Sequence, residues 1–336
     1  MGILKRVYGV IKKPAHWSWK LTRWTWGLPG PFKLFTVPAL ALSILFGYIA
    51  YVMPVDGLSR LFMSSEPTIL PYDGDAPDSN LEIVALGGAS SSPSAQYSEL
   101  LATFKKEAKR VLVVENAPEK FSDQNVIDAV VKAIDPKMNV IFIGASMGGL
   151  LSYDIIDTLQ TKGDTRKFGV VPADAPMDGE DVTGVASALK SNKVTWLRHL
   201  FGYVANLWTP LIGLPPFEPG DVSQMSPNVN RSELEKSNAS YENWKTTAWL
   251  DQGEYVFGHD PLKKLSNVFW VYIRSDGDEF VDGIGAHAKL QKSQGVRITL
   301  LHVARAGHIS FHDWPGEYAH QFKTAIDELK RKIAAA

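Results

Sequence analysis

Residues 139–150 read NVIFIGASMGGL, an apolar run that leads through a glycine-flanked serine into a helical pattern. The β-branched part predicts a buried strand, and the G-x-S-x-G pattern predicts a sharp turn from that strand into a helix. Such a turn requires small residues where strand and helix approach each other, and Gly144, Gly148 and Gly149 meet this requirement. Ser146 stands at the corner and is a candidate nucleophile, whereas the alternative is an ordinary glycine-rich turn.

Short apolar runs alternate with amphipathic segments on both sides of this turn. The predicted strands are 81–86, 110–115, 139–144, 168–173, 268–273 and 296–303, and the predicted helices are 95–109, 123–134, 149–160 and 313–332. Continuous apolar strands are typical of a parallel sheet that helices cover on both faces. The alternation therefore predicts an α/β fold with a doubly wound, mostly parallel sheet.

The alternation stops between Met177 and Pro261, where aromatic residues and prolines accumulate. We expect an insertion at about 178–262 that lies over the carboxyl ends of the strands as a cap above Ser146. Most of its aromatic side chains would form the small core of the insertion itself, and a few would line an apolar pocket.

The composition is that of a folded protein of 336 residues, with 45% hydrophobic and 21% charged residues. This length suits one large domain with an appendage. The chain has no cysteine, which excludes disulfides, thiol catalysis and thiolate metal sites. We expect no metal ion and no organic cofactor.

The N-terminal region is basic and leads into an apolar segment. Seven Lys and Arg residues and no acidic residue precede position 34, so the net charge of −1 leaves about −8 for the remainder. Residues 34–55, LFTVPALALSILFGYIAYVMPV, carry no charge and are long enough to cross a bilayer as a helix. Tryptophans before this segment and tyrosines near its end suit the headgroup level. The cations place the N-terminus in the cytoplasm and the large domain outside it.

A cleaved signal peptide is the main alternative for this segment. Its charged region would be unusually long, and no small-residue cleavage site is evident after Tyr48. The membrane also explains the basic residues better than a nucleic-acid partner does, so we expect no nucleic acid. The predicted organisation is a basic cytoplasmic segment at 1–33, a single transmembrane helix at 34–55, a tether with a possible edge strand at 56–80, and a large domain at 81–333.

A serine nucleophile needs a base within hydrogen-bond reach. His308 is the candidate, because it follows the final predicted strand and Gly307 lets the loop turn back toward the carboxyl edge of the sheet. His302 lies inside that strand and suits a packed or hydrogen-bonded imidazole. We expect His312 and His320 to face solvent near or in the last helix, and His259 belongs to the end of the insertion.

The base needs an acid to orient it, and SDGDEFVD at 275–282 follows the strand that precedes the strand of His308. Asp278 is favoured, because it follows Gly277 and precedes an apolar pair that would pack on the sheet. The alternatives that stay open are Asp276 and Asp282 in the same turn, and Asp174 or Asp178 in a variant arrangement. Turn formation alone would also explain such aspartates.

Acyl transfer requires N–H donors for the developing oxyanion. Met147 offers its backbone amide at the start of the predicted helix. The second donor is expected in LGGAS at 86–90, where Gly88 or Ala89 would approach a ligand closely.

These motifs together resemble the α/β-hydrolase fold family over residues 81–333. The matching pieces are GASMGG at 144–149, LGGAS at 86–90, SDGDEFVD at 275–282 and AGHISF at 306–311, and the order Ser, Asp, His is that of the family. The resemblance implies Ser146 as nucleophile, Asp278 as orienting acid, His308 as base, and Met147 with Gly88 as oxyanion donors. The sequence departs from the family where Leu86-Gly87 replaces the usual His-Gly pair.

The resulting expectation is a membrane-anchored serine hydrolase that cleaves a small-molecule ester or a lipid-like ester by an acyl-enzyme mechanism. A thioesterase, an amidase or an acyltransferase would use the same residues. A binding protein without catalysis on the same scaffold is the alternative from another class.

Overall fold

One sheet forms the centre of the part of the chain that this computed structural model describes, which is residues 65–88, 92–116, 121–183 and 246–336. Its strands are β1 (Thr68–Asp73), β2 (Leu81–Leu86), β3 (Arg110–Glu115), β4 (Asn139–Ala145), β5 (Phe168–Ala173), β6 (Val268–Ser275) and β7 (Thr299–Val303). Their order across the sheet is β1-β3-β2-β4-β5-β6-β7. The edge strand β1 runs antiparallel to β3, and every other pair is parallel, which confirms the predicted fold class.

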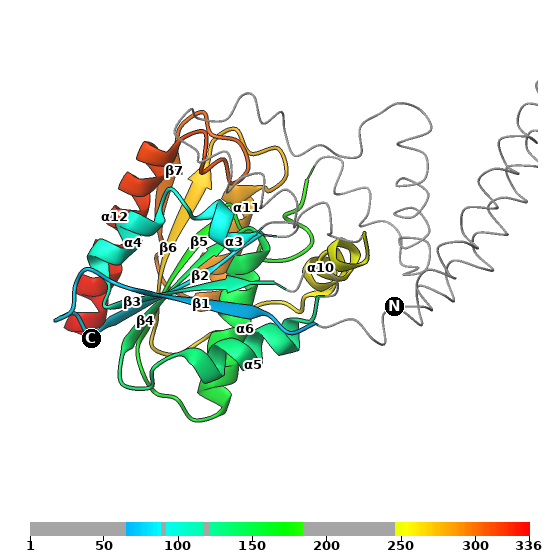
Figure 1. Ribbon diagram of the computed structural model, residues 1–336. Helices are drawn as coiled ribbons and strands as arrows, with labels where there is room; N and C mark the ends of the chain where they lie inside the picture. The colour runs from blue at the N-terminus through cyan, green and yellow to red at the C-terminus, as the bar shows by residue number, and fades with distance from the viewer. Residues whose placement is uncertain (1–64, 89–91, 117–120, 184–245) are drawn as a thin grey trace, which may run out of the picture. The chain divides into compact units, whose positions relative to one another are not determined.

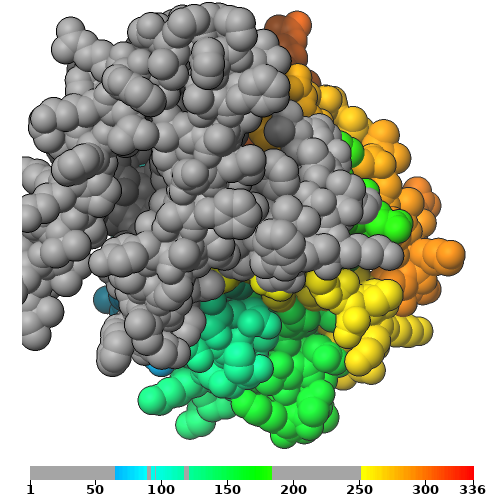
Figure 2. Space-filling model, turned by 90° about the vertical axis from the view of Figure 1, so that its right-hand side faces the viewer, coloured from blue at the N-terminus to red at the C-terminus, as the bar shows by residue number. Residues whose placement is uncertain are grey.

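Helices cover both faces of this sheet (Figure 1). They are α3 (Pro93–Gln96), α4 (Leu101–Glu107), α5 (Asp123–Ala133), α6 (Met147–Thr161), α10 (Thr246–Gly258), α11 (Gly283–Gln294) and α12 (Pro315–Ala335). The apolar core on one face includes residues of α5, α6 and α11, and the core on the other face includes residues of α4 and α12. On the surface, α10 (yellow) lies beside the green and teal segment that contains α5 and α6 (Figure 2).

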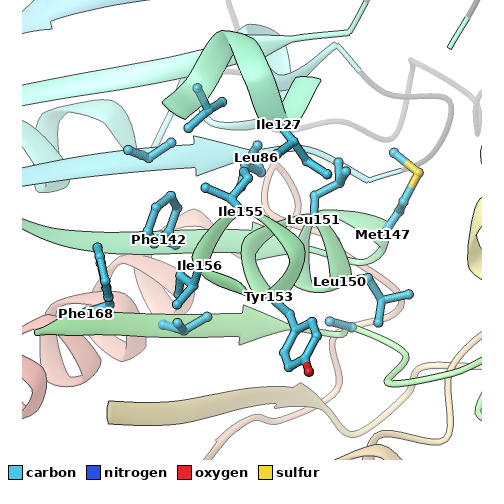
Figure 3. Packing of buried hydrophobic residues seen from close by; sticks show 14 of the residues in the cluster. Leu86, Ile127, Phe142, Met147, Leu150, Leu151, Tyr153, Ile155, Ile156 and Phe168 are labelled. Atoms are coloured by element: carbon cyan, nitrogen blue, oxygen red, sulfur yellow. The ribbon is translucent and has the colours of Figure 1, made fainter. Parts of the chain in front are cut away.

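Alternate residues of each central strand point to opposite faces of the sheet. In β4, Phe142 belongs to the core under α6, whereas Ile141 and Ile143 belong to the core under α12. Figure 3 shows Ile156 of α6 beside Phe142 and next to Phe168 of β5. Burying one such side chain stabilises the fold by about 1.5–3 kcal/mol. Strands that are buried on both faces are mostly apolar, which is why these strands are nearly continuous apolar runs. The exception is the buried Glu82 of β2, which pairs with Arg110 at 2.6 Å.

The structure differs from the predicted elements at three places. The predicted helix at 95–109 is split into α3 and α4 around the buried residues Tyr97 and Leu100. Helices α10 and α11 are not among the predicted helices. The last strand begins at Thr299 rather than at 296, because the Ile298 amide donates to a side chain of α11 instead of joining the sheet.

Several predictions about the N-terminal region and the insertion lie outside the described residues. These are the basic segment at 1–33, the transmembrane helix at 34–55, the first part of the tether, and residues 184–245 of the predicted cap. Among the helices that the structure does describe, none has the length and apolar character to cross a membrane.

Candidate active site

Ser146 lies at a strained corner between β4 and α6. Its φ of 49° and ψ of −121° fall in a region that side chains rarely adopt and that costs about 1–3 kcal/mol. The neighbouring glycines cannot be replaced without movement of the backbone. A Cβ atom on Gly144 would lie 2.3 Å from the carbonyl oxygen of Gly148, and one on Gly148 would lie 2.4 Å from that of Leu86. The corner therefore presents the Ser146 side chain at the carboxyl edge of the sheet.

The structure brings Ser146 together with the predicted base and the favoured acid. His308 Nε2 lies 3.0 Å from Ser146 Oγ, and His308 Nδ1 lies 2.8 Å from Asp278 Oδ2. The three residues follow β4, β7 and β6, whose carboxyl ends meet at one edge of the sheet. The His308 side chain is 16% exposed and that of Asp278 is 3% exposed. A nucleophile, a base and an orienting acid thus stand in hydrogen-bond contact, with the acid largely buried.

Asp278 uses its two carboxylate oxygens for two different tasks. Oδ1 accepts the backbone amides of Phe280 at 2.8 Å and Val281 at 3.0 Å, which closes the turn after β6. Oδ2 faces the imidazole of His308. Turn formation and orientation of the base are therefore not competing explanations for this residue.

The competing aspartates of the sequence have other partners. Asp276 lies 3.2 Å from His302 Nδ1 and 3.5 Å from Arg274. Asp282 caps the N-terminus of α11 through the Gly285 amide. Asp178 accepts from the ammonium group of a lysine on α11 at 2.8 Å. In the described part of the chain, Asp278 is the aspartate that contacts the base.

Asp174 directly follows β5 and bonds to the segments that carry the base and the acid, without a hydrogen bond to the imidazole ring. It is buried at a φ of 48°, and its carboxylate accepts the amide of Ser275 at 2.6 Å and the amide of Ile309 at 3.0 Å. Tyr318 Oη donates to it at 3.2 Å. Burial raises the pKa of Asp174. Through its bonds to the Ile309 and Ser275 amides, Asp174 ties the loop of His308 to the end of β6.

The other histidines near this region contact different groups. His302 is exposed on β7 and His320 is exposed on α12. His259 Nε2 lies 3.1 Å from Asp154; burial alone would lower the pKa of His259, but this carboxylate raises it. The prediction that His312 faces solvent is wrong, because the residue is half-buried, and burial lowers its pKa.

The two predicted oxyanion donors differ in whether their amides already have a hydrogen-bond acceptor. Met147 is the first residue of α6, where an amide has no carbonyl acceptor within its own helix. The Gly88 backbone lies against the nucleophile, since a Cβ atom there would be 3.0 Å from Ser146 Cβ. However, the Gly88 amide donates to Gln96 Oε1 at 3.3 Å. It can serve an oxyanion only by exchanging this acceptor, and Ala89 lies outside the described residues.

The beginning of the predicted insertion is attached to the turn that holds Asp278. The amide of Thr183 donates to the Phe280 carbonyl at 2.8 Å, and the amide of Asp282 donates to the Asp181 carbonyl at 2.7 Å. The ring of Phe280 lies 5.5 Å from the imidazole of His308, centre to centre, and the residue is 51% exposed. An apolar surface therefore adjoins the candidate base.

No group of three or more His, Asp or Glu side chains suited to a metal ion occurs within the ranges 65–88, 92–116, 121–183 and 246–336.

The sequence itself matches no protein-family model and none of the curated proteins. Similarity is found in solved structures. A monoacylglycerol lipase from Paleococcus ferrophilus superimposes with a TM-score of 0.50 at 13% identity, over 79% of this chain and 99% of the lipase. A carboxylesterase from Nitrososphaera gargenis gives 0.53 at 11%, over 79% and 96%. A protein from Desulfitobacterium hafniense, described as of the α/β-hydrolase family, gives 0.51 at 10%, over 76% and 99%. The chain thus has the α/β-hydrolase fold.

Proposed function

We propose that this protein is a serine hydrolase that cleaves a carboxylic ester in two steps. The observation that carries this proposal is the hydrogen-bonded series from Ser146 Oγ through His308 to Asp278. Each member has the chemistry that its place requires, because a serine hydroxyl is a poor nucleophile without a base, and the base needs an orienting partner.

The mechanism follows from which nitrogen faces which group. Asp278 Oδ2 accepts the proton on Nδ1 of His308, so that Nε2 is free to take the Ser146 proton. The Ser146 oxygen then attacks the ester carbonyl, and the resulting oxyanion accepts hydrogen bonds from backbone amides, including that of Met147. His308 returns its proton to the leaving alcohol as the carbon–oxygen bond breaks. Water, deprotonated by the same nitrogen, attacks the acyl-enzyme, and release of the acid restores Ser146.

An apolar acyl group is the substrate feature that we propose for this site. The half-exposed residue Phe280 beside His308 offers an apolar surface next to the base, which an apolar acyl group would contact. A monoacylglycerol lipase and a carboxylesterase both have a similar fold, and a fold by itself does not select the substrate.

Covalent labelling of the full-length chain tests the proposal. A fluorophosphonate probe should modify the folded protein, and mass spectrometry should locate the adduct on Ser146. The same preparation should hydrolyse p-nitrophenyl esters, with a preference along a series of acyl chain lengths. Thioesters and anilides in the same series would reveal a thioesterase or an amidase. A folded protein that reacts with none of these substrates and is not labelled would be a binding protein on this scaffold.

We also propose that a single helix at 34–55 anchors the protein, with its N-terminus in the cytoplasm. The support is the uncharged run of that segment and the seven cations before it. Protease added to intact cells that express the full chain should digest the large domain and spare residues 1–33. Complete protection of the large domain until the cells are lysed would contradict this orientation.

A further inference from the structure

A single buried hydroxyl links the ends of the two strands that lead into the candidate site. Tyr97 Oη donates to the carbonyl oxygen of Leu86 at 2.8 Å and accepts the backbone amide of Ala145 at 3.1 Å. Leu86 is the last residue of β2, and Ala145 is the last residue of β4. The hydroxyl therefore joins the two strands at the point where both end.

The register of the strands explains why a hydroxyl is needed there. The last pair of β2 and β4 is Leu86 with Gly144, so Ala145 follows the end of the paired ladder. Amides along a central parallel strand point alternately to its two neighbours. The Ser146 amide donates to Ala173 of β5 at 2.9 Å, which leaves the Ala145 amide directed toward β2. The Tyr97 hydroxyl thus links β2 and β4 just before both segments of the chain leave the sheet.

Each of the segments that follow β2 and β4 carries a predicted oxyanion donor. Gly88 lies two residues after Leu86, and Met147 lies two residues after Ala145. The segments are also in close contact, because a Cβ atom on Gly148 would lie 2.4 Å from the Leu86 carbonyl oxygen. A shift of Leu86 relative to Ala145 would therefore change the spacing of the two donors.

The hydroxyl is itself held firmly in place. Tyr97 is 1% exposed, and its ring lies 5.8 Å from the ring of Phe104 and 5.5 Å from that of Phe311, centre to centre. Burial raises the pKa of Tyr97, so the hydroxyl keeps its proton and can donate and accept at the same time. The preceding residue, Gln96, holds the Gly88 amide.

We propose that Tyr97 is a positioning residue for the oxyanion site, whose hydroxyl fixes the spacing between the Gly88 and Met147 amides. The inference rests on the proposed ester hydrolysis. A donor that is displaced from the developing oxyanion stabilises the transition state less, whereas binding of the uncharged ester changes little. Loss of the hydroxyl should therefore lower kcat and leave KM nearly unchanged.

The test is the Tyr97→Phe variant of the full-length chain, assayed with p-nitrophenyl butyrate. We expect kcat to fall about 10- to 100-fold, less than or similar to the loss of a whole oxyanion donor. KM should stay within about threefold. Phenylboronic acid, which forms a tetrahedral adduct with the serine, should inhibit more weakly by about the same factor as kcat falls.

Tyr153→Phe is the matched control. Tyr153 is also buried, and its hydroxyl donates to the Lys263 carbonyl at 3.1 Å and accepts the Lys263 amide at 2.6 Å. This variant loses the same two kinds of hydrogen bond on α6, away from the nucleophile. We expect its kcat to stay within about twofold of wild type, although the unfolding temperatures of both variants should fall.

If both variants fold, any of three results would overturn the inference. They are an unchanged kcat in Tyr97→Phe, an equal loss of kcat in Tyr153→Phe, and a change confined to KM. If Tyr97→Phe folds poorly, the assay is repeated in sucrose, which favours the folded state. Recovery of full kcat together with the folded fraction would show a purely structural role. If the wild-type chain is neither labelled nor active, the proposed function itself is contradicted, and the inference about Tyr97 is contradicted with it.

Discussion

Replacing Ser146 with alanine is expected to lower kcat for ester hydrolysis by about 10⁵- to 10⁶-fold, because the variant has no oxygen to form the acyl-enzyme. The oxyanion donors and the substrate site would remain, so the variant should still hydrolyse the ester about 10³- to 10⁴-fold faster than the uncatalysed reaction in water. Hydrolysis of p-nitrophenyl esters by the highly purified variant measures this loss. The fluorophosphonate adduct should disappear completely.

Ser152→Ala is the control for this variant. Ser152 is a buried serine on α6, close in sequence to Ser146, and its hydroxyl donates to the carbonyl of Gly148 at 2.8 Å. Its loss should reduce stability by about 1 kcal/mol and change kcat by less than about threefold. Alanine at position 146 keeps the Cβ atom, so it meets the same backbone strain as serine and the variant should stay folded. More than about 1% residual activity in Ser146→Ala would contradict the nucleophilic role.

The central strands could be predicted to within a residue or two, because their burial on both faces leaves a clear mark in the sequence. Residues 110–115 are an apolar run with polar residues at both ends, and residues 81–86 are apolar except at Glu82; they form β3 and β2 with the predicted bounds. Helix α11 lacks such a mark, since only Gly283, Ala286, Leu290 and Gln294 are buried and one of these is polar. Its position depends on the sheet against which it packs and on the cap from Asp282.

The predicted site residues could be placed by their order relative to the strands. Ser146, Asp278 and His308 each follow a strand whose carboxyl end lies at the same edge of the sheet, so the topology alone brings them near each other. Asp174 also follows a strand and is an alternative acid in the sequence, but its bonds to the Ser275 and Ile309 amides could not be predicted from this order. Tyr97 could not be found in this way at all. Tyr97 lies in an amphipathic segment where an aromatic residue indicates only core packing, and its hydroxyl contacts depend on the register of β2 and β4.

Backbone strain marks the same region as the side-chain contacts. Within the described residues, Ser146, Asp174 and Ile309 adopt φ values of 49°, 48° and 42°. Ile309 follows His308, and its amide is bonded to the Asp174 carboxylate. Strained residues of this kind persist only where surrounding contacts hold them, and they cluster at functional sites. The loop of the base, like the corner of the nucleophile, is thus a strained segment, and a buried carboxylate bonds to it.

Asp278→Asn is expected to lower kcat by about 10³- to 10⁴-fold, although the two side chains have nearly the same shape. The turn after β6 requires an acceptor for the amides of Phe280 and Val281, so the asparagine oxygen should stay in the position of Oδ1. The amide nitrogen would then face His308 Nδ1 and donate to it. This contact favours the tautomer that carries its proton on Nε2, which cannot accept the proton of Ser146.

Asp276→Asn distinguishes this effect from a general loss of negative charge near the site. Asp276 is two residues away in the same turn, but it faces His302 and Arg274 on the surface. We expect its kcat to stay within about threefold of wild type, because exposed ion pairs contribute little. Both variants should unfold at nearly the wild-type temperature, since the turn keeps its acceptor in each case. An Asp278→Asn variant that retains more than about a tenth of the wild-type kcat would show that this carboxylate does not control the tautomer of His308.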